Sequence, residues 1–524
     1  MTNTIDDLGR ADVMLLVGSN ATDAHPVIGA MLRANARAGT QRLVVIDPRR
    51  TSLARSAVLH LRPRPGSDVA LLNAIMNVVL DEGLADDAFI AERTEGFEAL
   101  AAHVREWTPE RAEEFTGVPA DDIRAAARIF AEAERGAIGY CMGVTQHVGG
   151  TDTVLAIADL AMLTGNIGRE GTGVYPLRGQ NNVQGACDMG ALPDLLPGYK
   201  RADDPDARAA FEQAWDVELP TTPGLSVVEM TQAAHDGRVK ALYVMGENPV
   251  LSDPDQAHVV EALRALDFLV VQDIFLTETA RLADVVLPAA AFAEKDGTFT
   301  NTERRVQLVR RAVAPPGEAR TDLDIVWGLC RRIGVTALSS AKGVMAEIAA
   351  VVPQYAGVTY ERLEAGGLQW PVYDADHPGT PILHAHAFTR GLGMFVVVEP
   401  QARPADGMIL LTGRLREQYH TGSMTRRSVI GELQPTAFVE INPIDAARLD
   451  IAEGDVVEID NERGSIQVEA RVNDASPVGA VFVPMHFAEA AVNALTDASR
   501  LDPQSRMPAL KATPVRVRKI VLKR

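Results

Sequence analysis

The chain has 524 residues, of which 47% are hydrophobic and 23% are charged. This composition is typical of globular proteins, and the length allows roughly two to four domains of about 100 to 200 residues each. The formal net charge of -19 repels phosphate backbones and anionic membrane surfaces. The sequence therefore argues against nucleic acid and lipid headgroups as partners.

The three cysteines, Cys141, Cys187 and Cys330, lie far apart and show no CxxC spacing. This excludes a disulfide framework and any iron-sulfur or zinc site built from this chain alone. No apolar run approaches the roughly 20 residues of a membrane span. The first residues, MTNTIDDLGRADV, lack the basic and apolar regions of a signal peptide, so we expect a cytoplasmic protein.

The first 300 residues repeat one pattern, in which a run of branched aliphatic residues precedes Gly, Asn, Asp or Gln. Most of these runs follow it: ADVMLLVGSN, RLVVIDPRR, AIGYCMGVTQH, ALYVMGENP, FLVVQDIF and ADVVLPA. Such strands, separated by helical stretches, indicate parallel α/β sheets. One helix is predicted from Ser67 to Leu80, with Ser67 as its N-cap and Gly83 as its stop. Its apolar face would consist of Val69, Leu72, Ile75, Met76 and Val79. Ligands of such sheets bind at the carboxyl ends of the strands, where the polar residues cluster.

From Met408 the pattern changes to short strands and turns: MILLTGR, TAFVEI, GDVVEID, the turn NERG, SIQVEARV and GAVFVPMHF. These elements predict a closed β-barrel domain, with PVRVRKIVLK as its last strand. The stretch from Val313 to Pro404 is less regular, and we interpret it as the tail of the α/β part.

The stretch from Leu177 to Pro193, LRGQNNVQGACDMGALP, places one arginine, four side-chain amides and three glycines between apolar runs. A turn needs only one or two such residues, so this row of donors and acceptors indicates a large polar ligand. VGSNATDAHP follows a strand and precedes a helix, where backbone N-H groups can hold phosphate, although it is not GxGxxG. Asp47 ends the second strand and suits a ribose or base contact, or equally a turn or helix cap.

Three further features leave alternatives open. The histidines His25, His147, His420 and His486 have no metal-ligand spacing, which favours core or capping roles. GTFTNTERRVQ has strand propensity and the composition of a surface hairpin. HTGSMTRR suits phosphate and heterocycle recognition, but an exposed basic loop explains it equally well.

Five long segments of the chain resemble the catalytic subunit of molybdenum- or tungsten-dependent formate dehydrogenases, of the dimethyl sulfoxide reductase superfamily. They are LRGQNNVQGACDMGALP, MGVTQHVGGTDTVLAIADLAMLTGNIG, MGENPVLSD, VVQDIFLTETARLADVVLPAAAFAEKDGTFTNTERRVQ and TGRLREQYHTGSMTRR. The resemblance implies two parallel-sheet α/β domains, residues 1–180 and 181–404, followed by a C-terminal β-barrel domain, residues 405–524. It also implies a Mo or W atom held between two molybdopterin guanine dinucleotides, which would account for the row of polar residues.

By resemblance, one pterin dinucleotide would contact Gly18, Asn20, Asp47, Arg49, Gly66, Asp68 and Gly143 to Gln146. Its counterpart would contact Gly246, Glu247, Gln272, Asp273, Thr277 and Asp322. Asp47 and Asp322 suit guanine or ribose, because carboxylates accept from N-H and O-H donors. The loop that closes over both pterins would use Arg414, Glu417, His420, Thr421 and Ser423.

Arg178 aligns with the substrate arginine of the family, and Gln180 beside it would orient the pterin or the site. A guanidinium stays charged and pairs with a carboxylate such as formate through two parallel hydrogen bonds. This arginine favours formate over nitrate as the substrate. The alternatives are another oxidoreductase of the superfamily, such as a nitrate reductase, and a noncatalytic subunit that holds cofactor.

Family members begin with a 4Fe-4S region, followed by a Cys or Sec that ligates the metal and an adjacent histidine. MTNTIDDLGRADVMLLVGSN resembles the interior of the family's chain, so we expect that amino-terminal part to lie upstream of Met1. It would complete the second α/β domain and cover apolar surface. The expected partners are that amino-terminal part, formate, and iron-sulfur or flavin subunits that accept electrons. The absence of a signal peptide then carries no information on export.

Overall fold

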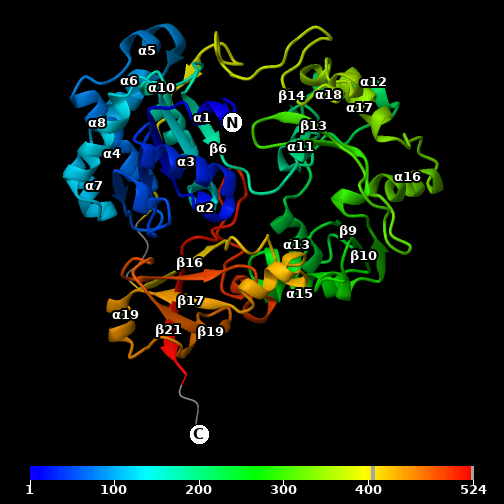
Figure 1. Ribbon diagram of the computed structural model, residues 1–524. Coiled ribbons are helices and arrows are strands. Elements are labelled where there is room, and N and C mark those ends of the chain that lie inside the picture. The colour runs from blue at the N-terminus through cyan, green and yellow to red at the C-terminus, as the bar shows by residue number, and fades with distance from the viewer. Residues whose placement is uncertain (403–406, 521–524) are drawn as a thin grey trace. The chain divides into compact units, whose positions relative to one another are not determined.

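The computed structural model describes residues 1–402 and 407–520, and Figure 1 shows their secondary structure. The chain forms two compact units. The first consists of Met1–Leu177, Leu251–Ala257 and Ile382–Arg524, and the second of Arg178–Val250 and His258–Pro381. The first unit contains both an α/β region and a barrel, so the predicted division into three domains stays a prediction.

The first unit contains a five-stranded parallel sheet, as the strand pattern predicted. Its order is β3 (Leu59–Leu61), β2 (Arg42–Ile46), β1 (Val13–Val17), β5 (Gly136–Tyr140) and β6 (Gly173–Pro176). Val17 at the end of β1 lies opposite Ile46 on one side and Tyr140 on the other. The strand order reverses at β1, and in open parallel sheets such a reversal opens a crevice at the carboxyl ends of the strands.

Both faces of this sheet are covered by helices (Figure 1). Val13 and Leu15 pack in the core that contains α4 (Asp68–Asp81), α8 (Ala120–Ala131) and α10 (Gly150–Leu163). Met14 and Leu16 point to the opposite face, toward α1 (Ile5–Leu8) and α3 (Pro26–Ala38). The near-continuous apolar runs of the strands follow from burial on both sides.

The predicted helix from Ser67 to Leu80 is confirmed as α4, with two differences. All residues from Val69 to Val79 are buried, because α4 packs against α6 (Phe97–Val104), α7 (Pro109–Thr116), α8 and α10 rather than presenting one apolar face. Ser67 occupies the N-cap position, but its hydroxyl donates to the carbonyl of Arg64 at 2.6 Å and does not cap the helix. Gly83 follows with a φ of +66°, as expected for a stop.

The remaining elements of this α/β region are short. They are α2 (Ala21–Ala24), α5 (Asp87–Arg93), β4 (Thr94–Glu95), α9 (Met142–Thr145) and β15 (Gly393–Met394). β15 pairs with β4, and Phe395 and Val398 are buried in the same core as β1. Residues 393–398 of the irregular stretch from Val313 to Pro404 therefore belong to the first α/β region, and the last residues of that stretch, 403 and 404, lie outside the described residues.

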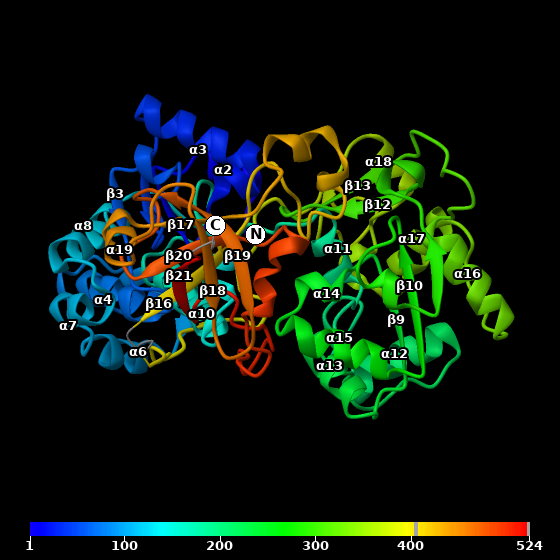
Figure 2. The same cartoon turned by 90° about the horizontal axis from the view of Figure 1, so that it is seen from below.

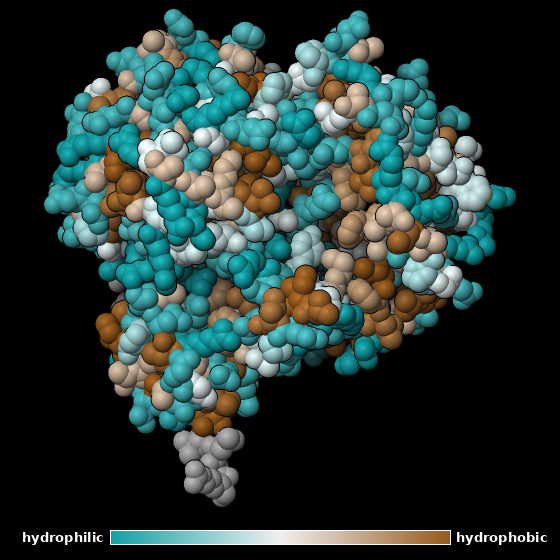
Figure 3. All heavy atoms as spheres, viewed as in Figure 1, coloured by the Kyte–Doolittle hydropathy of each residue, from teal (hydrophilic) through white to brown (hydrophobic). Residues whose placement is uncertain are grey.

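The second unit contains a three-stranded parallel sheet in the order β11 (Val285–Pro288), β10 (Phe268–Asp273), β9 (Ala241–Met245). Its helices include α13 (Val227–His235) and α15 (Gln256–Ala265), and α14 spans Pro249–Ser252. Leu269 and Val271 are buried on one face, whereas Tyr243 and Met245 on the other are 40% and 48% exposed. Figure 3 shows hydrophobic side chains at the surface in the region of β9 and β10. Parallel sheets are normally covered on both faces, so this face is unusual.

The rest of the second unit is built around an antiparallel sheet, β12 (Gly297–Thr300), β13 (Arg305–Val309) and β14 (Leu368–Gln369). The hairpin predicted for GTFTNTERRVQ is confirmed, but its turn is not a surface feature, because Arg304 is only 2% exposed. The surrounding elements are α11 (Val183–Asp188), β7 (Leu195–Leu196), β8 (Lys200–Arg201), α12 (Pro205–Trp215), α16 (Asp322–Arg332), α17 (Ala341–Val351) and α18 (Tyr360–Glu364).

The predicted C-terminal barrel is confirmed as a closed six-stranded barrel (Figure 2). Its strands are β16 (Met408–Gly413), β20 (Ala480–Pro484), β17 (Phe438–Ile441), β19 (Ser465–Val472), β18 (Val456–Asp460) and β21 (Thr513–Lys519), and α19 (Pro443–Arg448) follows β17. Ile466, Val468 and Ala470 alternate with exposed residues along β19 and fill the interior. The expected turn NERG joins β18 to β19 through an Asn461 N-H to Gly464 carbonyl bond of 3.1 Å.

Within residues 1–402 and 407–520, no helix combines the length and the apolar character needed to cross a membrane.

Candidate functional site

Two glycines join the loops that follow β1 and β5, where the strand order reverses. The Gly143 N-H donates to the Gly18 carbonyl at 3.1 Å, and Gly18 has a φ of +54°. A Cβ placed on Gly143 would lie 2.3 Å from that carbonyl oxygen. Only glycine permits this approach, so these predicted residues shape the end of the sheet. Gly66, in the loop before α4, also adopts a left-handed conformation, with a φ of +84°.

Two acidic side chains lie near these loops. Asp47 follows β2 and accepts the Arg49 N-H at 2.8 Å, and burial raises the pKa of its carboxyl group to about 6. Burial raises the pKa of Asp68, at the start of α4, to about 7, and the negative charge of Asp47 adds to that shift. Both side chains nevertheless keep some solvent access. The structure thus brings together two predicted residues that can accept N-H or O-H donors.

Cationic groups surround the same place. Lys511 donates to the Thr412 carbonyl at 2.8 Å, and burial lowers the pKa of its ammonium group to about 8, an effect that Cys141 and Asp47 oppose. Arg49 pairs with Glu440 at 2.5 Å and stacks on the Phe482 ring, with 3.4 Å from its guanidinium carbon to the ring centroid. Its buried Nε has no hydrogen-bond partner among residues 1–402 and 407–520. Sequence reasoning missed Lys511, because it lies just before the last barrel strand in no recognisable motif.

The loop after β5 contains Gln146, an expected cofactor contact, and His147, for which a core or capping role was expected. Burial lowers the pKa of His147 to about 4, so its neutral ring donates from Nε2 to the Gly143 carbonyl at 2.9 Å. The main-chain carbonyl of Gln146 accepts the Leu510 N-H at 3.1 Å. His147 therefore has the supporting role that its lack of metal-ligand spacing predicted.

A buried histidine shapes the barrel loop that contains Arg414. His486 Nε2 accepts the Leu415 N-H at 2.9 Å, which leaves Nδ1 to donate to the His420 carbonyl, and burial lowers the pKa of His486 to about 4. Arg414 donates to the Gln418 carbonyl at 3.0 Å and reaches the Ala24 carbonyl at 3.4 Å. The predicted barrel loop therefore meets the loop that follows β1.

The other predicted residues of this unit make mainly local contacts. Asn20 donates to Asp23 at 2.7 Å, Glu417 pairs with Arg416 at 3.0 Å, and the Thr421 and Ser423 hydroxyls lie 3.0 Å apart. The two arginines of HTGSMTRR are also engaged: Arg426 forms two hydrogen bonds to Glu489, and Arg427 donates to the Ser423 carbonyl. These two arginines stabilise the loop.

In the second unit, the carboxyl ends of β9 and β10 carry a polar chain. The Gln272 amide donates to Asp322 at 2.6 Å and accepts from the Tyr243 hydroxyl, while Lys295 pairs with Asp322. The structure joins the predicted Gln272 and Asp322, 50 residues apart, and adds Lys295 and Tyr243, which sequence reasoning missed.

The neighbouring predicted residues shape the loops at these strand ends. Gly246 has a φ of +63° and open space where a side chain would be, and its N-H donates to the Gln272 carbonyl at 2.8 Å. Half-buried Glu247 follows it. Asp273 accepts the Phe275 N-H at 3.2 Å, and the buried Thr277 accepts the Ala280 N-H at 3.2 Å, as turn and cap residues do.

Arg178 begins the second unit, two residues beyond β6. It is half-buried, and its N-H donates to the Thr302 hydroxyl at 3.1 Å. Burial raises the pKa of the nearby Cys187 thiol, and the charge of Arg178 opposes that shift. Gln180 is exposed, and its carbonyl accepts the Val183 N-H at 3.5 Å.

These groups fit a large anionic cofactor that carries purine bases. Lys511 and the unpartnered Nε of Arg49 can donate to a diphosphate. Asp47 and Asp68, with raised pKa values, can accept from purine N-H groups. In the second unit, Gln272, Lys295 and Asp322 offer an amide, an ammonium group and a carboxylate.

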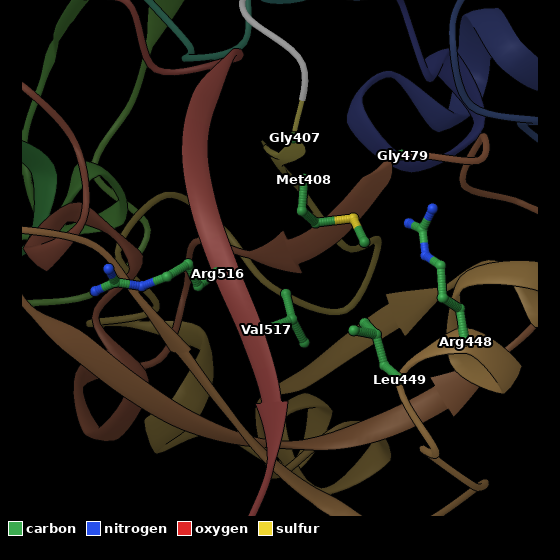
Figure 4. A pocket seen from close by; sticks show the side chains of 7 residues that line it. All are labelled: Gly407, Met408, Arg448, Leu449, Gly479, Arg516 and Val517. Carbon is green, nitrogen blue, oxygen red and sulfur yellow. The ribbon is translucent and has the colours of Figure 1, made fainter.

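A separate pocket of about 380 Å³ lies on the barrel (Figure 4). Its walls consist of Gly407, Met408, Arg448, Leu449, Gly479, Arg516 and Val517, none of which was predicted as a site residue. Arg448 pairs with Asp445 at 2.6 Å, and Arg516 pairs with Asp460. Because each of these two arginines is paired with a carboxylate, the lining of the pocket does not favour an ionic ligand.

Two family models match the chain. Residues 1–332 match the molybdopterin oxidoreductase family, and residues 408–514 match the molybdopterin dinucleotide binding domain. The chain is 48% identical over 532 residues to the F420-dependent formate dehydrogenase subunit alpha of Methanocaldococcus jannaschii, an alignment that covers 99% of this chain and 78% of the relative. It is 38% identical to formate dehydrogenase H of Escherichia coli, over 99% of this chain and 74% of the relative.

Among solved structures, acetylene hydratase from Pelobacter acetylenicus superposes with a TM-score of 0.75 at 20% sequence identity, over 98% of this chain and 78% of that structure. At this identity the likeness shows a shared fold. Acetylene hydratase and the formate dehydrogenases differ in the reactions that their names state, so the shared fold alone does not assign a substrate to this chain.

Proposed function

The chain belongs to the molybdopterin oxidoreductase family, and from this premise we propose that it oxidises formate to carbon dioxide as the catalytic subunit of a formate dehydrogenase. The observation that carries the proposal is the half-buried Arg178 at the head of GQNNVQGACDMG, in a chain with 46–48% identity to three proteins named as formate dehydrogenase alpha subunits. A permanent cation in this position suits a small carboxylate substrate.

We propose that the cofactor is a Mo or W atom held by two molybdopterin guanine dinucleotides. The residues around Asp47, Asp68 and Lys511 would hold one dinucleotide, and those around Gln272, Lys295 and Asp322 the other. The barrel loop that contains Arg414 would contact the pterins. When bound, this group would supply the two-electron redox chemistry of formate oxidation.

The part of Arg178 in the reaction follows from charge. Its guanidinium binds the formate carboxylate through two parallel hydrogen bonds and so fixes the direction of the C-H bond. Formate, an anion, is converted to carbon dioxide, a proton and two electrons, so the ionic attraction to Arg178 disappears with the reaction. Arg178 thereby favours substrate entry without retaining the neutral product.

We further propose that the electrons pass through a 4Fe-4S cluster to iron-sulfur or flavin subunits. Three relatives are named as F420-dependent enzymes. These names support F420 as the electron acceptor of the complex. The alternatives of a nitrate reductase and of a noncatalytic subunit remain distinguishable by assay.

The test is a dye-linked assay of the assembled, metal-loaded complex with both candidate substrates. Formate-dependent reduction of a viologen dye, without nitrate-dependent oxidation of the reduced dye, is the expected result. Turnover of nitrate alone would assign the chain to a different branch of the family. A complex that retains pterin but turns over neither substrate would favour the noncatalytic alternative.

A further inference from the structure

The turn between β12 and β13 is held by many hydrogen bonds, although its sequence, TNTER, suggested only a surface connection. Asn301 stabilises it, because its Oδ1 accepts both the Glu303 N-H at 3.1 Å and the Arg305 N-H at 3.0 Å. Arg304 adopts a left-handed conformation, with a φ of +66°, and is almost completely buried. A non-glycine residue keeps such a conformation only where surrounding contacts fix it.

The guanidinium of Arg304 supplies those contacts. It donates to the carbonyls of Thr380 at 2.9 Å and Pro381 at 3.2 Å, and also to that of Trp370. Burial lowers its pKa to about 10, so the group remains charged at neutral pH. A buried charge is tolerated only when it is hydrogen-bonded, and these carbonyls therefore fix the orientation of the turn.

This anchored turn holds the segment that contains Arg178. The Thr302 hydroxyl accepts the Arg178 N-H at 3.1 Å, and the Thr300 N-H donates to Asn182 Oδ1 at 2.9 Å. The contact is close: a Cβ on Gly185 would lie 2.3 Å from Asn182 Oδ1 and 3.1 Å from the Thr300 hydroxyl. One turn therefore holds this segment at two places, at the main chain of Arg178 and at the side chain of Asn182.

A buried carboxylate anchors the helix that follows. Asp188, at the end of α11, accepts from Tyr355 at 2.6 Å, Gln184 at 2.7 Å and Tyr199 at 2.8 Å. Burial raises the pKa of Asp188, while these three donors and the charge of Arg178 oppose the shift. The Tyr355 hydroxyl also lies 3.4 Å from the Thr300 hydroxyl, so the network returns to the same turn.

We propose that Thr302 is a positioning residue for Arg178, and that Asp188 holds the following helix in support. The inference rests on the proposed function, in which Arg178 binds formate. Two parallel hydrogen bonds to a carboxylate require the guanidinium to be held to within a fraction of an ångström. The hydrogen bond from the Arg178 N-H to this anchored turn fixes the point from which the Arg178 side chain extends.

The test compares Thr302→Val, which keeps the shape but removes the acceptor, with Thr302→Ser, which keeps the hydroxyl. Both are made in the complete metal-loaded complex. For Thr302→Val we expect the KM for formate to rise about tenfold with a smaller change in kcat, as loss of one hydrogen bond predicts. Amide exchange of the peptide that contains Arg178 should accelerate by a similar factor. Thr302→Ser should restore both values.

A second variant keeps the test independent of how Thr302→Val folds. Tyr355→Phe removes one donor from Asp188 without changing the ring, and we expect faster exchange in α11 and a smaller rise in KM. Unchanged exchange near Arg178 in Thr302→Val would overturn the proposal, as would faster exchange with unchanged formate kinetics. A wild-type complex that does not oxidise formate would contradict the proposed function. If the wild-type complex oxidises formate but the variants keep its KM and its amide exchange, only the positioning role is contradicted.

Discussion

Asp47 and Asp68, which follow β2 and begin α4, lie close enough for the charge of Asp47 to raise the pKa of Asp68. Both carboxyl groups already have raised pKa values because they are buried. Two such acids in one place are unfavourable without a ligand that donates hydrogen bonds to them. This relationship supports a binding role for this end of the sheet and has consequences for stability.

The cofactor-free chain should lose stability as the pH rises from about 4 to about 7. Over this window the folded chain holds a proton on Asp68 that the unfolded chain has released, because burial raises the folded pKa to about 7. Asp68→Asn removes this dependence and should be the more stable form at pH 7.5, with a gain of about 1.4 kcal/mol for each unit of pKa difference as an upper bound. Thermal unfolding of wild type and Asp68→Asn at several pH values measures how the free energy of unfolding depends on pH. Asp121→Asn, at an exposed carboxylate, is the control and should follow wild type. If stability falls with pH equally steeply in wild type and in Asp68→Asn, the prediction is contradicted.

Lys511→Gln should reduce retention of the pterin cofactor. The ammonium group, half-buried among the loops at the sheet end, would donate to a diphosphate, and loss of one charge-assisted bond costs about 1.5 to 3 kcal/mol, or roughly 10- to 100-fold in affinity. Pterin released from the purified protein by acid and measured by fluorescence gives the content. Lys342→Gln, at an exposed lysine paired with Glu361, should retain the wild-type content. Equal pterin in both variants would remove Lys511 from the site.

Arg178→Lys should lower kcat/KM for formate by roughly 100-fold and leave the pterin content unchanged. Lysine keeps the charge but cannot form the two parallel hydrogen bonds of a guanidinium. Steady-state kinetics of the loaded complex provide the measurement. Arg331→Lys, at an exposed arginine stacked on Trp327, should behave as wild type. Wild-type kinetics in Arg178→Lys would refute its role in substrate binding.

His486→Ala should loosen the barrel loop around Arg414, because the loop loses its bonds to Leu415 and His420. Faster amide exchange in residues 414–420 is the expected result. A pH effect accompanies it: burial lowers the folded pKa of His486 to about 4, so its contribution is present at neutral pH and is lost as the pH falls from about 6.5 to about 4. His235→Ala, at a half-exposed histidine, is the control. Unchanged exchange in the loop would show that His486 does not hold it.

The sequence determined the parts of this protein that depend on local pattern. Strand runs such as VMLLV and RLVVI are buried on both faces of the sheet, and their apolar sequences indicated parallel α/β sheets. The alternation of apolar and polar residues in SIQVEARV indicated a barrel strand. Because strand ends carry the polar residues, Asp47 could be nominated as a candidate ligand contact before any fold was known, and the family resemblance added Gln272. The resemblance of GQNNVQGACDMG then identified Arg178 as the candidate substrate residue.

The tertiary structure alone decided which distant residues meet. Lys511 reaches Thr412 across 99 residues, and Thr302 meets Arg178 across 124. Neither lysine nor threonine has a local signature for such a role, since periodicity reports which face a residue occupies but not which segment packs against it. The same limit explains why Arg304 seemed to lie in a surface hairpin. Its burial depends on the carbonyls of Thr380 and Pro381, and only the packing of the folded chain brings these beside the turn.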